Sequence, residues 1–345
     1  MGMANVQLII ATVAELRSVA TSVSMTPPAT VFTCAFSNDG SLLAAGDSRS
    51  ALNVWETSSV AGEVDKCQRF AMPLDTTCRM RTNARAGPIY SVVFAENRLV
   101  SGGDLSIKVW DIDCVEEPLL ELVNPQGTTA AGGLTAVSET NGLAYCSETR
   151  ALFSASGQAA AFQWDLSTGQ VVMRFAGHDD YLHCISMGVT PSTILTGSED
   201  GFVRLWDIRS GECEAVLAQP GGKHWISSIC CYGDWMSCGS GSGSLFTYHV
   251  ASRSLVQTYT AAPPILAVSH VDSSLVSAGG SPYVNVWNAD GTERNRIAYP
   301  VAPLYDIAVN PDPAARFRMA TCGASSTVAL VGDPMLPPST TIQVV

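Results

Sequence analysis

The chain has 345 residues, of which 46% are apolar and 14% are charged. This composition excludes an intrinsically disordered chain, which needs few apolar residues, and a coiled coil, which needs many charged ones. The 19 basic and 31 acidic residues give a net charge of −12, the wrong sign for gripping phosphates, so we expect no direct contact with nucleic acid. Because the sequence has no apolar run of about 18 residues, we also expect no membrane-spanning helix.

The first 29 residues are predicted to form a separate helical extension. Val6, Ile9, Val13 and Leu16 recur at helical spacing, and the two prolines at 27–28 end the pattern. We therefore divide the chain into an N-terminal helical extension, residues 1–29, and one large domain, residues 30–345.

The large domain repeats one pattern: small residues with glycine, a polar turn, an alternating run and then an aromatic residue. The clearest copy runs from Ile194 to Asp207. The residues that end the seven copies, called anchors below, are Trp55, Trp110, Trp164, Trp206, Tyr248, Trp287 and, without an aromatic ring, Val331. Their spacings of 55, 54, 42, 42, 39 and 44 residues are typical of four-stranded propeller blades. The sequence thus predicts an all-β, seven-bladed β-propeller.

Three details of this propeller are expectations. The two long spacings predict insertions at Ser58–Gly87 and Cys114–Gly133. The alternation from Thr340 to Val345 predicts the outer strand of the last blade, with a closing strand from the N-terminus as the alternative. The 11 cysteines lack metal-ligand spacing and are interpreted as reduced, buried apolar residues.

One copy has a further set of polar residues at fixed places: His178 after a glycine, then Thr196, Asp200 and Trp206. With these residues the chain resembles the WD-repeat β-propellers. That resemblance implies a buried structural network from His178 through Asp200 and Thr196 to Trp206. A nucleophile relay of the same residue types is the alternative, but buried groups that satisfy one another are the simpler interpretation. We therefore expect no enzyme activity, no catalytic residue, no cofactor and no metal site.

A rim of the propeller is the predicted partner-binding surface. Tyr90, Tyr181 and Trp225 are placed at one register at the start of the inner strands, and Asp180 and Glu199 flank them. Aromatic residues at a rim are frequent binding hot spots. The alternative is that these rings only cover the top of the core.

The residues Trp206-Asp207-Ile208-Arg209 carry a second possibility. They match the Trp-Asp-x-Arg motif of WD-repeat proteins that serve as substrate receptors of cullin-RING ubiquitin ligases. In that interpretation Asp207 and Arg209 contact a ubiquitin-ligase adaptor. The alternative is that Arg209 simply ends a strand.

Several longer segments resemble one family among the WD-repeat proteins. The run from Gly177 to Ile185, the run from Leu195 to Arg209 and the strand Asp234-Trp-Met-Ser-Cys-Gly239 are similar to the THO complex subunit 6 family. This resemblance implies a non-catalytic scaffold in the nucleus, part of a THO/TREX assembly that couples transcription to mRNA processing and export. It implies attachment through the coiled-coil THO subunits 5 and 7, with RNA contacted by other subunits.

Overall fold

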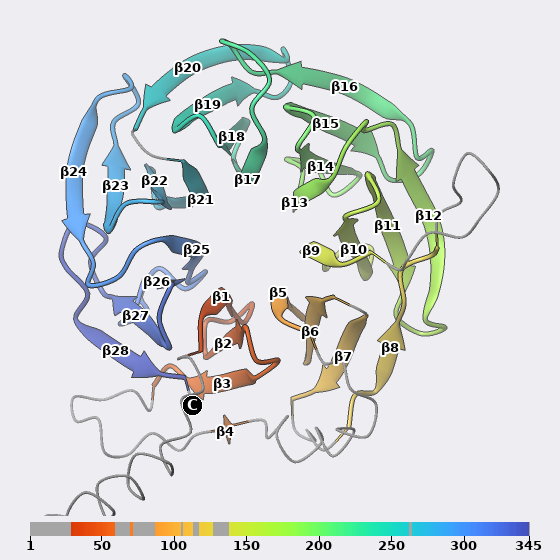
Figure 1. Ribbon diagram of the computed structural model, residues 1–345, viewed down its shortest axis with the longest axis horizontal. Helices are drawn as coiled ribbons and strands as arrows, with labels where there is room; N and C mark the ends of the chain where they lie inside the picture. Colours follow the sequence, from red (N-terminus) through yellow and green to blue (C-terminus); the bar gives the residue numbers. More distant parts are fainter. Residues whose placement is uncertain are drawn as a thin grey trace, which may run out of the picture.

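Seven antiparallel four-stranded sheets stand radially around one axis in the computed structural model (Figure 1). The structure describes residues 29–58, 70–71, 87–104, 106–112, 117–126, 138–261 and 264–344. The predicted seven-bladed, all-β propeller is confirmed. The predicted helix lies in residues 1–28, which are outside the described residues, and the residues that are described contain no helix that could cross a membrane.

Each sheet uses its four strands in chain order from the axis outward. The innermost strands are β1 (Val31–Phe36), β5 (Ile89–Ala95), β9 (Thr140–Cys146), β13 (Leu182–Met187), β17 (Ile226–Tyr232), β21 (Ile265–Val271) and β25 (Leu304–Val309). The second strands are β2 (Leu42–Asp47), β6 (Arg98–Gly103), β10 (Ala151–Ser156), β14 (Thr193–Ser198), β18 (Trp235–Ser240), β22 (Ser274–Gly279) and β26 (Met319–Gly323). The third strands are β3 (Leu52–Glu56), β7 (Ile107–Asp111), β11 (Ala160–Asp165), β15 (Phe202–Asp207), β19 (Ser244–His249), β23 (Tyr283–Trp287) and β27 (Thr327–Val331). The outer strands are β4 (Phe70–Ala71), β8 (Leu120–Leu122), β12 (Gln170–Ala176), β16 (Cys213–Ala218), β20 (Ser254–Thr260), β24 (Glu293–Ala298) and β28 (Thr340–Gln343).

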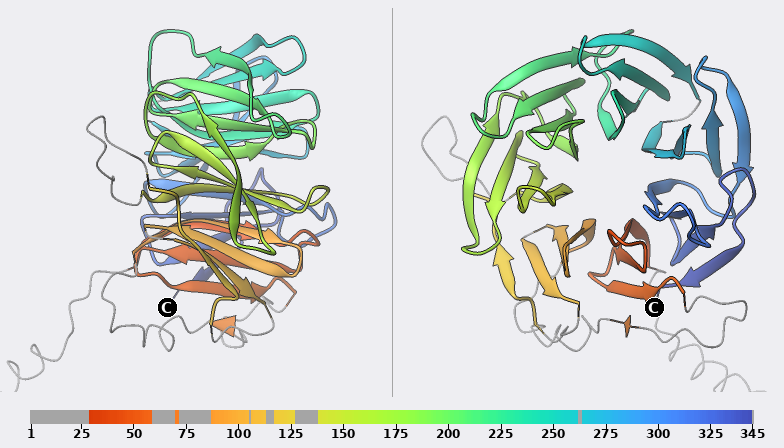
Figure 2. Two further views of the ribbon diagram at one scale, coloured as in Figure 1. Left: turned by 90° about the vertical axis from the view of Figure 1, so that its right-hand side faces the viewer. Right: turned by 180° about the vertical axis from the view of Figure 1, so that it is seen from behind.

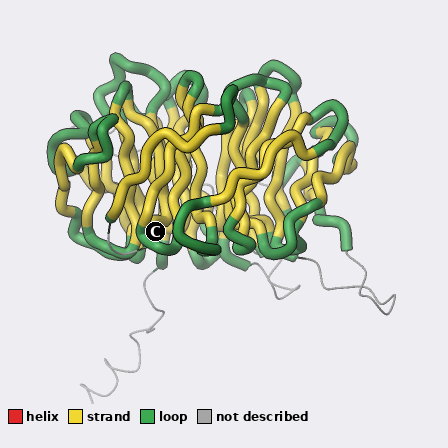
Figure 3. The backbone as a smooth tube through the Cα atoms, turned by 90° about the horizontal axis from the view of Figure 1, so that it is seen from above, coloured by secondary structure: helices red, strands yellow, loops and turns green. Residues whose placement is uncertain are grey.

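The blades form a disc whose loops gather on two faces (Figures 2 and 3). We call the face at which the innermost strands begin the mouth face, and the other one the opposite face. The strands of a blade alternate in direction, so the turns after the first and third strands lie on the opposite face. Two surfaces of the molecule are thereby separated by the length of a strand.

The seven anchors lie in the seven third strands, one in each blade, and all seven are buried. Period-2 alternation sends neighbouring side chains of a strand to opposite sides of the sheet. In β15, Trp206 packs into a core with Phe153 of the preceding blade, whereas Val203 packs with Phe246 of the following blade. Both faces of a blade are thus covered by other blades, which explains the small fraction of charged residues.

The last blade is completed by β28, which pairs with β27. The prediction for the strand that begins at Thr340 is thereby confirmed. The ring closes where β1 of the first blade lies beside β25 of the last blade. At this seam the Asp306 carboxylate accepts hydrogen bonds at 3.0 Å from the Thr33 hydroxyl and at 3.0 Å from the Cys34 backbone N–H.

Two predicted details need correction. The segments treated as insertions contain the short outer strands β4 and β8, so they also build the first two blades; much of the rest is outside the described residues. The cysteines that are described are free thiols, as expected, but Cys213 is exposed because it begins the outer strand β16.

Blade five carries two exposed aromatic residues on the opposite face. Tyr232 and Trp235 pair across the turn between β17 and β18, with exposed fractions of 48% and 39%. Tyr232 stacks on His270 of the next blade, with ring centroids 5.2 Å apart. The Nδ1 atom of His270 is buried and has no hydrogen-bond partner among the described atoms.

Acidification is expected to destabilise the fold through His270. Burial lowers the pKa of His270 from 6.5 to about 4, so between these values the unfolded chain binds the proton more strongly than the folded chain. The free energy of unfolding contributed by the neutral ring is therefore present above pH 6.5 and falls by about 2 kcal/mol as the pH drops toward 4. Urea unfolding at a series of pH values should show this loss in the parent protein and a smaller loss in His270→Gln. Identical pH profiles for the two proteins would contradict the conclusion that His270 causes the loss of stability.

Candidate functional site

A β-bulge lies near the start of every innermost strand. In β13, Leu182 pairs with Ser198 and Cys184 pairs with Gly197, so His183 is left without a partner in the register. The same shift occurs at the equivalent place in the other six innermost strands. A bulge re-aims the extra side chain. The seven residues, called the bulge ring, are Phe32, Tyr90, Asn141, His183, Ser227, Leu266 and Tyr305.

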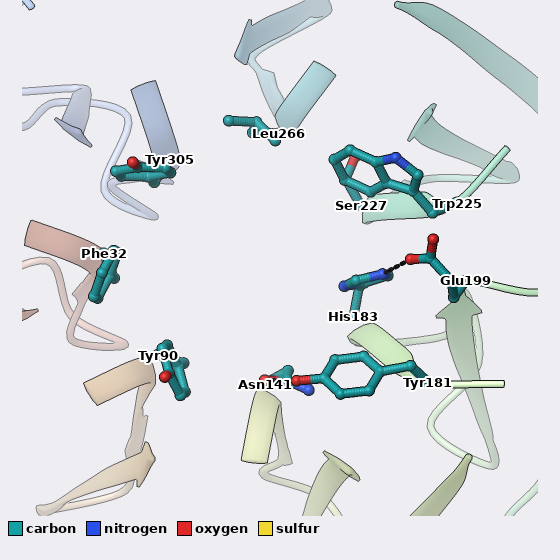
Figure 4. Close-up of a pocket in the computed structure, with 10 residues that line it drawn as sticks. All are labelled: Phe32, Tyr90, Asn141, Tyr181, His183, Glu199, Trp225, Ser227, Leu266 and Tyr305. Atoms are coloured by element: carbon teal, nitrogen blue, oxygen red, sulfur yellow. Dashed lines mark hydrogen bonds and ion pairs between the residues drawn. The ribbon is translucent and has the colours of Figure 1, made fainter. Parts of the chain in front are cut away.

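The bulge ring lines an open cavity on the propeller axis with a volume of about 620 Å³ (Figure 4). Tyr181, Glu199 and Trp225 complete the lining from the loops of the mouth face. We call this cavity the channel-mouth pocket. Its walls stand on seven different strands of a closed ring, so its shape is fixed by the packing of the whole propeller.

Two groups of rings face one another across the pocket (Figure 4). In the first, called the Phe32 group, Phe32 lies between Tyr90 and Tyr305 with centroid distances of 5.7 and 5.4 Å. In the second, called the His183 group, His183 lies between Tyr181 and Trp225 at 5.2 and 5.3 Å. The pocket is therefore walled largely by aromatic faces.

Glycines make room for the two outer rings of the His183 group. A side chain at Gly241 would overlap the indole of Trp225, and one at Gly157 would lie 2.8 Å from the ring of Tyr181. Gly157 and Gly241 thus leave space for the aromatic rings of the pocket, in addition to forming the turns in which they lie.

Carboxylates form hydrogen bonds with the polar atoms of the pocket lining. His183 Nε2 lies 2.6 Å from Glu199 Oε2, and the Tyr181 hydroxyl donates to Glu139. Burial, together with a hydrogen bond to Asp104, raises the pKa of Tyr90 to about 12. Burial and the bond to Glu139 likewise raise the pKa of Tyr181. Both phenols therefore stay protonated and neutral, which suits them to binding rather than to proton transfer.

The three aromatic residues predicted for the rim all line the pocket, but the prediction of one shared register was wrong. Tyr181 directly precedes Leu182, the first residue of β13, and Trp225 directly precedes β17. Tyr90 instead follows Ile89, the first residue of β5, and belongs to the bulge ring. Two sets of residues therefore line the pocket: those that directly precede an inner strand, and those at the bulge two positions later.

The two predicted flanking carboxylates have different positions. Glu199 lines the pocket, whereas Asp180 is exposed in the same loop region and accepts a hydrogen bond from the Tyr181 backbone N–H at 2.8 Å. The sequence interpretation missed Phe32 and Tyr305. Both could have been found as the residue after the first apolar position of an inner strand.

The structure brings His178, Asp200, Thr196 and Trp206 together. His178 Nδ1 lies 2.7 Å from Asp200 Oδ2, His178 Nε2 lies 2.8 Å from Thr196 Oγ1, and Trp206 Nε1 donates to Thr196 Oγ1 at 2.8 Å. One set of donors satisfies every member: the indole donates to the hydroxyl, the hydroxyl to Nε2, and Nδ1–H to the carboxylate.

The network has no access for a substrate, because the His178 and Asp200 side chains are only 1% and 3% exposed. Burial opposes the ionisation of Asp200, but hydrogen bonds from His178 and from the backbone N–H of Phe202 outweigh it and lower the pKa of Asp200. The carboxylate is thus ionised and internally satisfied. This geometry fits a structural role and leaves no free nucleophile.

Arg209 lies on the opposite face, in the turn between β15 and β16. Its Nη2 atom is 2.9 Å from Asp207 Oδ2, and its side chain is 78% exposed. The hydrogen bonds from Arg209 lower the pKa of Asp207 to about 2. The pair is explained by local hydrogen bonds that stabilise the turn between β15 and β16. Adaptor binding by Asp207 and Arg209 therefore stays a prediction.

Among the described residues, no three or more His, Cys, Asp or Glu side chains lie together in a way that could hold a metal ion. His249 Nδ1 instead bonds to Ser252 at 2.8 Å, and His183 pairs with Glu199.

Comparison with known proteins agrees with this architecture. The WD domain, G-beta repeat family model matches residues 21–56 and 169–207. The WD40 β-propeller domain of Doa1 superimposes with a TM-score of 0.68 at 15% identity, over 86% of this chain and 90% of that one, which shows the shared fold.

Comparison with individual curated proteins points to one family of WD-repeat proteins. THO complex subunit 6 of Homo sapiens is 28% identical over 295 residues, 83% of this chain and 84% of the relative. THO complex subunit 6 of Arabidopsis thaliana is 31% identical over 199 residues, which are 56% of this chain and 54% of the relative. The chain is a seven-bladed β-propeller that carries WD-type repeats and is similar to THO complex subunit 6.

Proposed function

We propose that this chain is a non-catalytic scaffold subunit of a THO complex and that its channel-mouth pocket binds a segment of another subunit. The observation that carries the proposal is the convergence of seven bulged side chains on one open cavity of about 620 Å³. Concave sites with aromatic walls on rigid strands bind partner segments well, because little entropy is lost on ordering the site.

The similarity to THO complex subunit 6 supports the choice of complex. We extend the proposal to a nuclear THO/TREX assembly that couples transcription to mRNA processing and export, with the coiled-coil subunits 5 and 7 as partners. The net charge of −12 fits a subunit that leaves RNA binding to others.

Affinity purification of the tagged full chain from nuclear extract tests this proposal. The parent protein should recover other THO subunits, with subunits 5 and 7 prominent. Trp225→Ala should reduce their recovery about tenfold, because it removes a large aromatic ring from the lining of the pocket. Mass spectrometry with labelled standards measures the ratio.

Trp235→Ala is the matched control, since Trp235 is a partly exposed tryptophan on the opposite face. It should leave recovery unchanged. Purification of the parent chain alone would refute the THO assignment, and loss of recovery in Trp235→Ala but not in Trp225→Ala would move the binding surface to the opposite face. The same experiment tests the alternative function, because recovery of a ubiquitin-ligase adaptor that depends on Arg209 would support a substrate-receptor role.

A further inference from the structure

We infer that the channel-mouth pocket recognises an arginine side chain presented by the partner segment. The inference rests on the proposed function, because it names the partner chemistry of the same pocket. Three features of the described residues support it: the charges of the mouth face, the contacts of the carboxylates around the pocket and the arrangement of the rings.

The described loops of the mouth face are predominantly acidic at their surface. The carboxylates there that are exposed or partly exposed are Asp104, Glu139, Asp179, Asp180 and Glu199. The basic residues on the same described loops are Arg49, which is near Asp47, and Lys223, whose Nζ lies 5.1 Å above the ring of Phe202. The opposite face mixes both signs, with Arg98, Arg150, Arg209, Arg253 and Arg318 among its acidic residues. A cationic ligand is therefore drawn to the mouth face.

Three carboxylates lie in the pocket lining or next to it without a lysine or arginine partner. Glu199 pairs with His183 and Glu139 accepts from Tyr181, while Asp104 lies beside Tyr90. Among the ion pairs within the described part of the chain, none joins these three carboxylates to lysine or arginine. Their negative charge lies close to the pocket and favours a cation over a neutral group there.

The two ring groups offer flat faces to a flat cation. A guanidinium is planar, stacks on aromatic faces and forms forked hydrogen bonds to carboxylates, whereas an ammonium is a compact and strongly hydrated charge. Trp225 and Tyr181 present rings on either side of His183, and Glu199 lies beside them at the pocket edge (Figure 4). This arrangement favours arginine over lysine. The volume of about 620 Å³ leaves room for the neighbouring residues of the segment.

Titration of the full chain with short capped peptides tests the inference directly. The probe is acetyl-Gly-Ser-Arg-Ser-Gly-amide, and the comparison peptides have citrulline or lysine at the central position. Citrulline keeps the planar shape of arginine and removes only its charge. The arginine peptide should bind about tenfold more tightly than the citrulline peptide, with the lysine peptide between them, and its affinity should fall as salt rises. Isothermal titration calorimetry or NMR shift titration measures the dissociation constants.

Two variants locate the binding on the protein. Glu199→Gln keeps an acceptor for His183 but removes the charge, and it should weaken the arginine peptide about fivefold while leaving the citrulline peptide unchanged. Glu148→Gln is the matched control, because Glu148 is an exposed carboxylate in the turn between β9 and β10 on the opposite face. It should change neither affinity.

Equal affinity of the arginine and citrulline peptides would overturn the inference, as would lysine binding as tightly as arginine or an equal effect of both variants. These outcomes are separate from failure of the proposed function. If THO subunits are captured equally by the parent and by Glu199→Gln but lost in Trp225→Ala, the scaffold proposal stands and the arginine inference falls. If no THO subunit is captured while the arginine peptide binds as described, the inference stands and the THO assignment falls.

Discussion

Trp206→Ala is expected to lower the free energy of unfolding by about 3–5 kcal/mol, the usual cost of truncating a fully buried large aromatic side chain. Trp206 is 1% exposed and contacts Phe175 and His178, with ring centroids 6.0 and 6.2 Å away. The substitution leaves a cavity between two blades and removes the indole donor from Thr196. Urea unfolding followed by circular dichroism measures the change.

Two companion variants separate the causes of this loss. Trp206→Phe keeps much of the ring volume but loses the Nε1 hydrogen bond, so we expect it to cost about half as much as Trp206→Ala. Trp235→Ala removes a partly exposed ring, and we expect it to cost under about 1 kcal/mol. Equal costs for Trp206→Ala and Trp235→Ala would refute the anchor role of Trp206.

Asp306→Ala is expected to lower the free energy of unfolding by about 2–3 kcal/mol through the seam between the first and last blades. The Asp306 carboxylate accepts bonds from Thr33 and Cys34 across the seam, and its removal leaves both donors unsatisfied. Burial raises the pKa of Asp306, which shows that the charge itself is costly there and keeps the net loss below that of Trp206→Ala.

Ser228→Ala is the matched control for the seam. Ser228 occupies the same register in β17, and its hydroxyl accepts a 3.1 Å hydrogen bond from the Val268 backbone N–H of the next blade. Only one neutral acceptor is lost there, so we expect a cost of about 1 kcal/mol. A larger effect for Ser228→Ala than for Asp306→Ala would show that the seam is not specially stabilised by the carboxylate.

The fold was predictable because each blade is encoded by one short, continuous stretch of sequence that repeats the same pattern of small, polar, alternating and aromatic residues. The anchors from Trp55 to Val331 lie at one place in every third strand, as their spacing indicated. The outer strands β4 and β8 were missed because strands of two and three residues are too short to show alternation.

The channel-mouth pocket was only partly predictable, for a physical reason. Its ring of seven side chains depends on a one-residue shift between β-strands, and a bulge reverses which side of the sheet a residue faces. Tyr90 was therefore placed at the wrong level, and the meeting of Phe32 with Tyr305 depends on closing the ring. The local network around His178 needed no such long-range information, because its members lie in one blade and the loop that leads into it.

The seam also has a consequence for the order of folding. Every sheet pairs only strands that are consecutive in the chain, so most contacts form between residues close in sequence. The bond from Cys34 to Asp306 instead spans 272 positions. Bringing such distant segments together costs more loop-closure entropy than pairing neighbouring strands, so we expect this step to be slow. Blades can thus assemble one after another as an open arc, and the channel-mouth pocket becomes complete only when the two ends of that arc meet.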